Sequence, residues 1–447
     1  MVNSPRDYHH VTTVERSDGY FARGSPKTFP PEILEDPGGH FVQRLAHESD
    51  EDFQSILEDT PSPRTPSPES TSAQQTFWAV YRDIPEKWKL KSTERVVEDI
   101  IHDACMATDS NFMSKSSLLP SFVIDLGDED VKRLFLPPEL DEINAAMPGL
   151  PPPDDVLLGY LGEFASVRSV EELRATLHKN HYIPEGGTFD NARDGNKFYA
   201  YLALNTMLNI YASPNRPLTS DHCEDWFTSS VWASIIDNYI MSIPGITLDR
   251  KETHLRATGI RKNRSRTRTG KGNYRKSGRH YDGIIHSIGE GCVEYVVLEA
   301  SASEKGGETS TKYLDDWLKI GRGLRDMMNV LHLQANHNPK FLPHLQAIGI
   351  MNSASTFQYS RMVSPVGNIC LLKREDVLTI PAGLNGGLGQ LLHIITSMVK
   401  LRRTVDMTRS WIVSAVEGGL TPEELDRELR EGFKSYPARL SWADEAD

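Results

Sequence analysis

Hydrophobic residues recur at helical spacing in four stretches of the chain. The first is STERVVEDIIHDAC, and the pattern returns in SVEELRATLHKN, NKFYAYLALNTMLNIYA and LTSDHCEDWFTSSVWASIIDNYI. Because a helix turns about every 3.6 residues, this spacing places the apolar side chains on one face. The four stretches therefore predict helices that pack against a core, the last of them capped at its N-terminus by Ser220 or Asp221.

The pattern changes after residue 280. YDGIIHSIGEGCVEYVVLEA predicts two short strands around a glycine-bearing turn, and STKYLDDWLKIGRGLRDMMNVLHL predicts a helix of about six turns with Leu314, Trp317 and Leu324 facing inward. QAIGIM, TFQYSRM and VGNICLL predict further strands, and GLNGGLGQLLHIITSMVKLRR predicts a glycine-led final helix. The mixture of strands and helices predicts an α/β domain over residues 218–415.

The chain before this domain has two different textures. Residues 76–217 are mostly helical by pattern, with proline-rich breaks at LPPEL and MPGLPPPDD. Residues 1–75 contain nine prolines and 13 acidic against 6 basic side chains, with few neighbouring apolar residues, so we expect a disordered acidic tail. Residues 416–447 form a C-terminal acidic segment.

Within the tail, the segment DTPSPRTPSPES places four residues directly before proline, which is the context that proline-directed kinases select: Thr60, Ser62, Thr65 and Ser67. Phosphorylation would add about −1.5 to −2 charges at each site. The alternative interpretation is an unmodified polar tail.

Composition narrows the classes of function. The 447 residues carry 49 basic and 62 acidic side chains, a formal charge of 49 − 62 = −13, too acidic for a protein coated in nucleic acid. No run approaches the roughly 18 apolar residues of a membrane helix, and the N-terminus lacks the apolar core of a secretory signal. We therefore expect an intracellular protein, nuclear or cytoplasmic, without membrane contact.

The four cysteines lie far apart and include no C-x-x-C pair: Cys105, Cys223, Cys292 and Cys370. This distribution argues against a disulfide framework and against a structural zinc site. Reduced, mostly buried thiols are expected.

The strand pair after residue 280 suggests a metal site. If Glu290 and Gly291 form a two-residue turn, paired residues have numbers that sum to 581, so Ile288 faces Val293 and Asp282 faces Glu299. Opposed Cβ atoms are about 4.5–5.5 Å apart, where two carboxylates repel unless a cation lies between them. Mg²⁺ or Mn²⁺ suits such oxygen ligands. A register shifted by one residue would instead place the two carboxylates on opposite faces.

The order of these elements resembles the PD-(D/E)XK nuclease-like superfamily: a helix with Glu224, a strand with Asp282 and Gly283, a strand ending at Glu299, a helix and a strand. The segments at 279–285 (R-x-x-D-G-I-I) and 311–319 (T-K-Y-L-x-D-x-L-K) are also similar to uncharacterised fungal proteins of this type. The resemblance covers roughly residues 218–400. It implies a mixed sheet flanked by helices and metal-dependent hydrolysis of nucleic-acid phosphodiesters.

Residue roles follow from the resemblance. It implies that Asp282 and Glu299 hold Mg²⁺ or Mn²⁺, that Glu224 completes the acidic cluster, and that a lysine orients the attacking water. The family places this lysine two residues after the glutamate, where this chain has Ser301. Lys312, or Lys305 in the preceding loop, would have to replace it.

Two classes of function follow from the missing lysine. One is a magnesium-dependent endonuclease or an inactive descendant that still binds nucleic acid. The other is a non-catalytic protein-interaction scaffold, whose N-terminal half binds a protein partner and whose tail regulates it.

A basic run extends over residues 256–279 and holds ten Lys or Arg in 24 positions. Arginine forks match phosphate oxygens, so this run predicts nucleic-acid contacts. The alternatives are a solvated loop and a nuclear import signal. The predicted contacts are Arg261, Lys262, Arg264, Arg266, Arg268, Lys271, Arg275 and Lys276.

Overall fold

A computed structural model describes residues 77, 81–107, 117–183, 186–220, 222–264, 276–289, 292–301 and 311–416. Several expectations fall on other parts of the chain. The tail 1–75, the turn at Glu290 and Gly291, Lys305 and the C-terminal segment after residue 416 lie outside the described residues.

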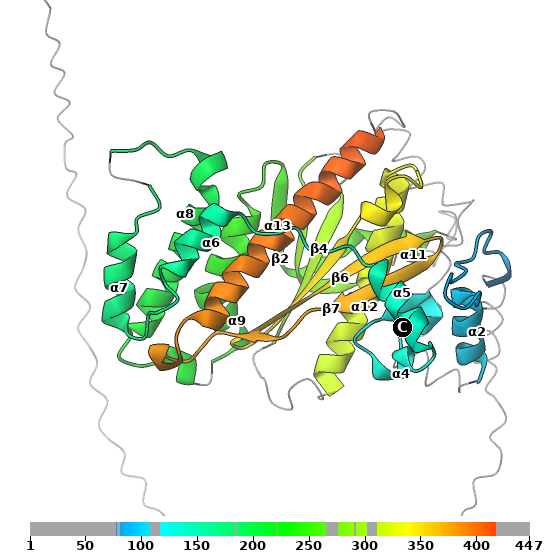
Figure 1. Cartoon of the computed structure of the whole chain (residues 1–447), viewed down its shortest axis with the longest axis horizontal. Helices are drawn as coiled ribbons and strands as arrows, with labels where there is room; N and C mark the ends of the chain where they lie inside the picture. Colours follow the sequence, from blue (N-terminus) through cyan, green and yellow to red (C-terminus); the bar gives the residue numbers. More distant parts are fainter. Residues whose placement is uncertain are drawn as a thin grey trace, which may run out of the picture. The chain divides into compact units, whose positions relative to one another are not determined.

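The described residues form an α/β fold around a mixed sheet of eight strands (Figure 1). The strand order is β1-β7-β6-β5-β4-β3-β2, and β8 pairs with β6. The pairs β1–β7 and β4–β5 are parallel, and the others are antiparallel. The strands are β1 (Val123–Asp125), β2 (Ile246–His254), β3 (His280–Ser287), β4 (Glu294–Ser301), β5 (Ala347–Ser353), β6 (Thr356–Val366), β7 (Ile369–Arg374) and β8 (Leu378–Thr379).

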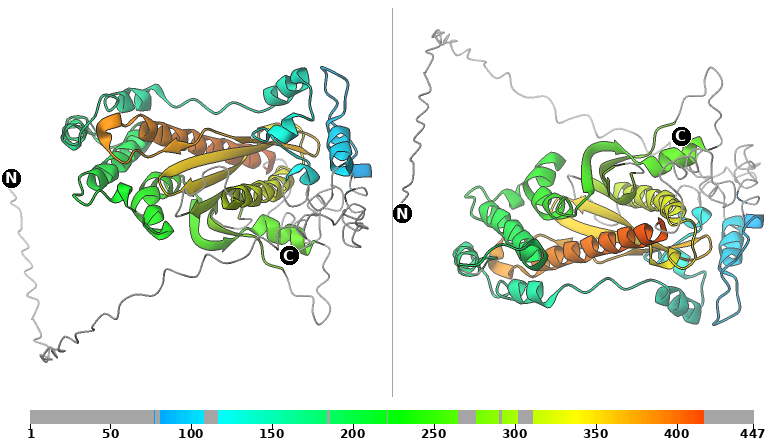
Figure 2. Two further views of the ribbon diagram at one scale, coloured as in Figure 1. Left: turned by 90° about the horizontal axis from the view of Figure 1, so that it is seen from below. Right: turned by 90° about the horizontal axis from the view of Figure 1, so that it is seen from above.

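Helices flank this sheet, as the sequence predicted. The two views of Figure 2 show the strands between α13 (Gly389–Val416) and α12 (Thr311–Gln334), and α12 packs against β4, β5 and β6. The remaining helices are α2 (Val97–Ala107), α4 (Glu129–Lys132), α5 (Pro137–Ala145), α6 (Asp155–Gly162), α7 (Val170–Lys179), α8 (Asn191–Tyr211), α9 (Glu224–Phe227), the π-helix η3 (Thr228–Asp237), α10 (Asn238–Ile240) and α11 (Arg256–Asn263). Short 3₁₀ turns are η1 (Leu119–Ser121), η2 (Pro217–Thr219), η5 (Leu342–His344) and η6 (Leu384–Gly386).

The crossover from β4 to β5 determines where the site can form. Parallel neighbouring strands cannot be joined by a tight turn, so the chain crosses over the sheet through α12. The first turn of α12 consequently lies near the end of β4: Lys312 Nζ is 3.5 Å from Oγ of Ser301, the last residue of that strand. Polar residues from two elements can therefore meet at this end of the sheet.

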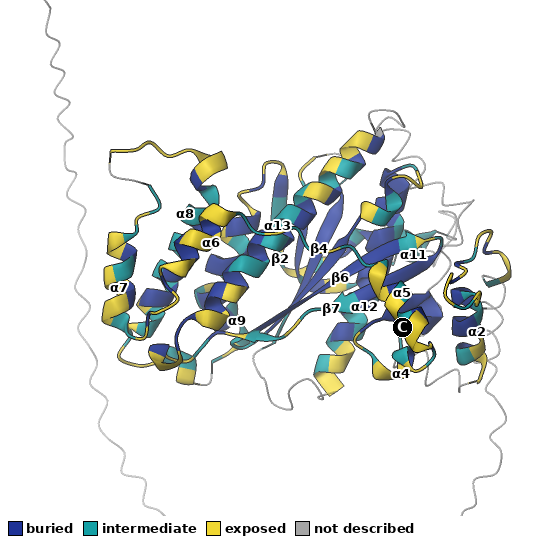
Figure 3. Cartoon of the chain, viewed as in Figure 1, coloured by how far each residue is buried: buried dark blue, intermediate teal, exposed yellow. Residues whose placement is uncertain are grey.

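The helical region before residue 218 divides between two hydrophobic clusters. Residues of α6, α7 and α8 join the main core with the sheet, α12 and α13, whereas Phe77, α2 and β1 form a smaller cluster with β6 and β7. Figure 3 shows the central strands β4, β6 and β7 mostly buried. Because β1 belongs to the sheet, the sheet includes residues well before the predicted start of the α/β domain at residue 218.

Several local expectations were wrong. The helix expected to be capped by Ser220 or Asp221 begins at Glu224, after Cys223, and makes no side-chain cap. Strand β2 was not predicted, because its sequence ITLDRKETH is polar and has only Ile246 buried. Helix α11 was not predicted either, because it lies in the basic run and buries only Ala257 and Thr258. Leu314 is 44% exposed, since the buried positions of α12 begin at Trp317 and its first turn extends beyond the core.

Close packing between α12 and the sheet explains the glycines in GRGLRD. A Cβ atom at Gly323 would overlap the Tyr281 hydroxyl and lie 2.9 Å from Cζ of that ring, and Tyr281 is only 1% exposed. The glycine therefore allows the β3 side chain to reach the helix backbone, where the Tyr281 hydroxyl donates a hydrogen bond to the Lys319 carbonyl at 2.7 Å.

We expect Gly323→Ala to lower the free energy of unfolding by about 1–3 kcal/mol, because overpacking outweighs the better helix propensity of alanine. Adding Tyr281→Phe, which removes the overlapping hydroxyl, should recover part of this loss. The double-mutant cycle is measured by urea denaturation. Gly386→Ala is the control, since a Cβ there meets nothing within 4 Å. Additive effects of the two substitutions would contradict the packing explanation.

Candidate functional site

The register of β3 and β4 brings Asp282 and Glu299 together at one end of the strand pair. Gly283 pairs with Leu298, Ile284 with Val297 and Ile285 with Val296, all with the predicted sum of 581. Asp282 and Glu299 are the next residues outward from the first of these pairs. The Ala300 amide donates a hydrogen bond to Asp282 Oδ2 at 2.7 Å, which fixes this carboxylate against β4.

The register at the other end of the strand pair was predicted wrongly. The pairing shifts between Ile285 and His286, so that His286 faces Glu294. The Ile288 amide then donates to the Gly245 carbonyl at 2.9 Å, and Val293 accepts from Ser287 instead. This irregularity changes the pairing only beyond Ile285, so the Asp282 end keeps the predicted register.

Glu299 is a buried carboxylate held by a lysine. It is 4% exposed, and Lys319 Nζ of α12 lies 2.6 Å from its Oε1. Burial raises the pKa of Glu299 to about 8, because the loss of solvent outweighs the attraction of Lys319, and the charges of Asp282 and Asp316 add to the rise. The Tyr281 ring lies 5.1 Å from the same ammonium, so one face of Lys319 is covered by an aromatic ring.

Two further carboxylates belong to the same electrostatic cluster. Burial and then the charge of Asp282 raise the pKa of Glu224, at the start of α9. The pKa of Asp316 on α12 is also raised, first by burial, with Lys312 and Lys319 opposing the rise and Asp282 adding to it. Asp282 thus raises the pKa of three other carboxyl groups, which is a concentration of negative charge that favours binding of a cation.

The structure brings together the four residues predicted to be catalytic, although in unequal roles. Lys312 is exposed, and its charge lowers the pKa of both Glu224 and Asp316. It is Lys319, however, that forms the ion pair with Glu299. Sequence reasoning missed Lys319 and Asp316. The signal was available, because Lys312, Asp316 and Lys319 follow each other at spacings of four and three and so share one helix face.

Metal ligation by protein side chains alone is not seen in the described part of the chain, where no three His, Cys, Asp or Glu residues are grouped to hold an ion. Nor is any helix among those residues long and apolar enough to cross a membrane. Asp282 and Glu299 supply oxygen donors from two adjacent strands. Alone, they would supply only part of the ligands of a hard cation and not a complete protein cage.

The structure describes part of the basic run. One of its predicted nucleic-acid contacts, Arg261, forms an ion pair within the protein. Arg261 on α11 has its Nε 2.7 Å from Asp326 Oδ1, and this carboxylate is 1% exposed. Lys262, Arg264 and Lys276 are each partly exposed. The other predicted contacts, Arg266, Arg268, Lys271 and Arg275, lie outside the described residues. Arg261 thus connects α11 to α12.

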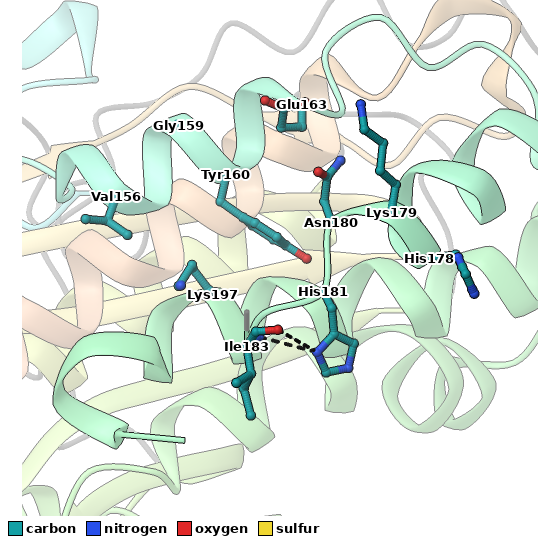
Figure 4. A pocket seen from close by; sticks show the side chains of 10 residues that line it. All are labelled: Val156, Gly159, Tyr160, Glu163, His178, Lys179, Asn180, His181, Ile183 and Lys197. Atoms are coloured by element: carbon teal, nitrogen blue, oxygen red, sulfur yellow. Dashed lines mark hydrogen bonds between the residues drawn. The ribbon is translucent and has the colours of Figure 1, made fainter. Parts of the chain in front are cut away.

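A cavity of about 820 Å³ lies away from the carboxylates, between α6, α7 and the start of α8 (Figure 4). Tyr160, Glu163, Lys179, His181 and Lys197 are among its lining residues. None of the carboxylates around Asp282 lines it. Its size therefore does not mark it as the place where those groups would act.

Comparisons with family models, with curated proteins and with solved structures found no match. Any function assigned to the carboxylate cluster therefore rests on its own geometry and chemistry.

The pKa of Glu299 gives a pH-dependent stability. Its folded-state value of about 8 exceeds that of an unfolded glutamate, so stability contributed by the protonated carboxyl is present at low pH and lost as pH rises toward 8. We expect Glu299→Gln, which cannot ionise, to be more stable than the wild type above pH 8, by on the order of 3 kcal/mol. The difference should shrink at pH 5.

Urea denaturation at pH 5 and at pH 9 measures the difference in stability between Glu299→Gln and the wild type. Glu171→Gln, on the exposed face of α7, is the control and should show no such change with pH. A difference between Glu299→Gln and the wild type that stays constant from pH 5 to pH 9 would show that burial does not raise the pKa of Glu299.

Proposed function

We propose that the chain is a metal-dependent nuclease of the PD-(D/E)XK type, which hydrolyses nucleic-acid phosphodiesters at Asp282, Glu299 and Lys319. One observation carries the proposal: Lys319 Nζ lies 2.6 Å from Oε1 of the buried Glu299, on the strand next to the one that holds Asp282. Ser301 leaves the expected lysine position without a charge. Lys319 supplies that charge from the neighbouring helix.

The arrangement of elements supports the proposal. Glu224 begins a helix, Asp282 lies on β3, Glu299 lies near the end of β4, and α12 then crosses to the parallel strand β5. This is the order that the resemblance implies, with β2 and α11 as additional elements before β3. A nuclease site at this end of the sheet would draw its carboxylates from two strands and its lysines from one helix.

Mg²⁺ or Mn²⁺ is the cofactor that suits the donors. Mg²⁺ is commonly held by one or two carboxylates, with waters and substrate phosphate oxygens as the remaining ligands, so the pair of Asp282 and Glu299 is sufficient. The ion would stabilise negative charge on the phosphate and lower the pKa of a bound water. Burial is the main cause of the raised pKa of Glu224 and Asp316, and a cation would offset the smaller part of the rise that comes from the charge of Asp282.

The side chains of the chain itself have separable tasks. The Ala300 amide orients Asp282, and the Tyr281 hydroxyl holds the turn of α12 that carries Lys319. The Lys319 side chain is 32% exposed, so its ammonium can donate to an attacking water or to a phosphate oxygen while it remains beside Glu299. Lys312, at the exposed end of the same helix face, would contact the substrate backbone.

Cleavage of single-stranded and double-stranded DNA and RNA in Mg²⁺ or Mn²⁺ tests the proposal. We expect Asp282→Asn and Glu299→Gln each to reduce the single-turnover rate by at least about 100-fold, the scale on which loss of one preorganised polar group acts. Glutamine is chosen over alanine at position 299 because the side chain is buried.

Asp141→Asn and Glu171→Gln make the same chemical changes at exposed positions of α5 and α7, and should cleave as the wild type does. If wild-type protein cleaves none of the four substrates with either ion, the chain is not a nuclease. Binding without cleavage would then indicate a descendant that binds nucleic acid, and absence of both would favour the scaffold.

The basic run should supply contacts that do not depend on base sequence. Replacing Arg264, Arg266 and Arg268 together with glutamine should weaken binding to nucleic acid and reduce the slope of log K against log salt by roughly 2–3, since each lost phosphate contact removes about 0.7–0.9. Fluorescence anisotropy of Glu299→Gln protein, with and without the three changes, measures the slope. An unchanged slope would assign the run to another role.

A further inference from the structure

Three side chains at the opposite end of the β3–β4 pair form a chain of contacts that the nuclease proposal does not use. Cys292 Sγ lies 3.1 Å from His286 Nδ1, and His286 Nε2 lies 2.9 Å from Asp249 Oδ2. The residues come from the loop before β4, from β3 and from β2. The shift in register between Ile285 and His286 is what leaves His286 in place to contact both neighbours.

The partners of His286 define its protonation. Nδ1 is also 2.9 Å from the Ser287 carbonyl oxygen, which can only accept, so Nδ1 carries a hydrogen. An ionised Asp249 likewise only accepts, so Nε2 carries a hydrogen as well. The ring is therefore an imidazolium, and the sulfur beside Nδ1–H is placed as an acceptor.

The electrostatics agree with this geometry. Contact with Cys292 raises the pKa of His286 to about 10, with the Ser287 carbonyl and Asp249 also raising it and burial opposing the rise. The His286 side chain is only 15% exposed, so water screens the pair weakly. An adjacent imidazolium is the usual means by which a protein favours the thiolate form of cysteine.

The arrangement is that of an activated nucleophile rather than a metal site. Asp249 binds the ring nitrogen that points away from the sulfur, so the three side chains cannot share one ion. In an activated thiol, by contrast, the base contacts the sulfur and a third group orients the base. Cys105 and Cys370 are buried, and burial raises the pKa of both thiols, whereas Cys292 is partly exposed.

We propose that Cys292 is a reactive thiolate, paired with the His286 imidazolium, and a site of reversible modification by peroxide. The sulfur attacks one peroxide oxygen and the O–O bond breaks. The departing hydroxide takes the Nδ1 proton of His286 and leaves as water. Sulfur loses two electrons to become the sulfenic acid, and the peroxide is reduced.

Other ionisable groups face the pair and must be separated from it. Glu294 on β4 interacts with His286, and burial raises its pKa to about 7; Tyr295 interacts with Cys292, and burial raises its pKa to about 12. Asp249 on β2 is a third such group among the described residues. Because the pKa of Glu294 is raised into the neutral range, variants are best compared at one pH.

Alkylation by iodoacetamide at pH 6, followed by mass spectrometry of each cysteine peptide, tests the proposal. Native Cys292 should react about tenfold faster than in the same chain unfolded in urea, because a free cysteine is only about 0.3% thiolate at pH 6. His286→Gln should remove this excess, and Asp249→Asn should reduce it. Exposed Cys223 is the internal standard, and its alkylation rate should be the same in the wild type and in both variants.

Hydrogen peroxide with a sulfenic-acid trap gives the second readout, and Cys292 should be labelled before Cys223. Asp249→Asn keeps the test decisive if His286→Gln fails to fold, because the Asp249 side chain is 55% exposed and its loss leaves the core intact. The proposal is overturned if native Cys292 reacts no faster than unfolded Cys292, or if peroxide labels Cys223 first. Neither result depends on whether the chain cleaves nucleic acid.

Discussion

The contact on which the candidate site depends is the ion pair between Glu299 and Lys319. A carboxylate that is 4% exposed costs free energy to ionise, and the ammonium only partly offsets this cost, since the pKa of Glu299 still rises to about 8. A protein selected only for stability would favour an apolar residue at this position. The pair beside Asp282, Glu224 and Asp316 therefore costs stability, and the proposed nuclease role gives a reason for this cost.

Two features of the fold position Glu299 and Lys319: the crossover from β4 to β5, and the packing of Tyr281 against α12. The parallel pairing of β4 with β5 requires a crossover, and the crossover helix α12 carries Lys319 to the end of β4. Gly323 allows Tyr281 to approach α12, and the Tyr281 hydroxyl then binds the backbone at Lys319. The position of the ammonium thus depends on a packing contact one turn away.

Much of this arrangement could be predicted from sequence, because it depends on periodicity and on strand register. The helix over 311–334, the strands after it and the proximity of Asp282 to Glu299 follow from local pattern. The spacing of Lys312, Asp316 and Lys319 shows that they share one helix face, but it does not show that this face meets β4, so the contact of Lys319 with Glu299 did not follow from sequence. Strand β2 was missed because its sequence is polar and only Ile246 is buried. The contact of Cys292 with His286 depends on an irregularity in register that pattern does not specify.

The most direct test of Lys319 as the replacement lysine compares Lys319→Gln with Lys312→Gln in single-turnover cleavage with Mg²⁺. Both changes remove one positive charge from the same helix face, but only Lys319 contacts Glu299. We expect Lys319→Gln to lose at least about 100-fold in rate, and Lys312→Gln to lose less than about tenfold, mainly through weaker binding. Equal rates for Lys319→Gln and the wild type would contradict the assignment.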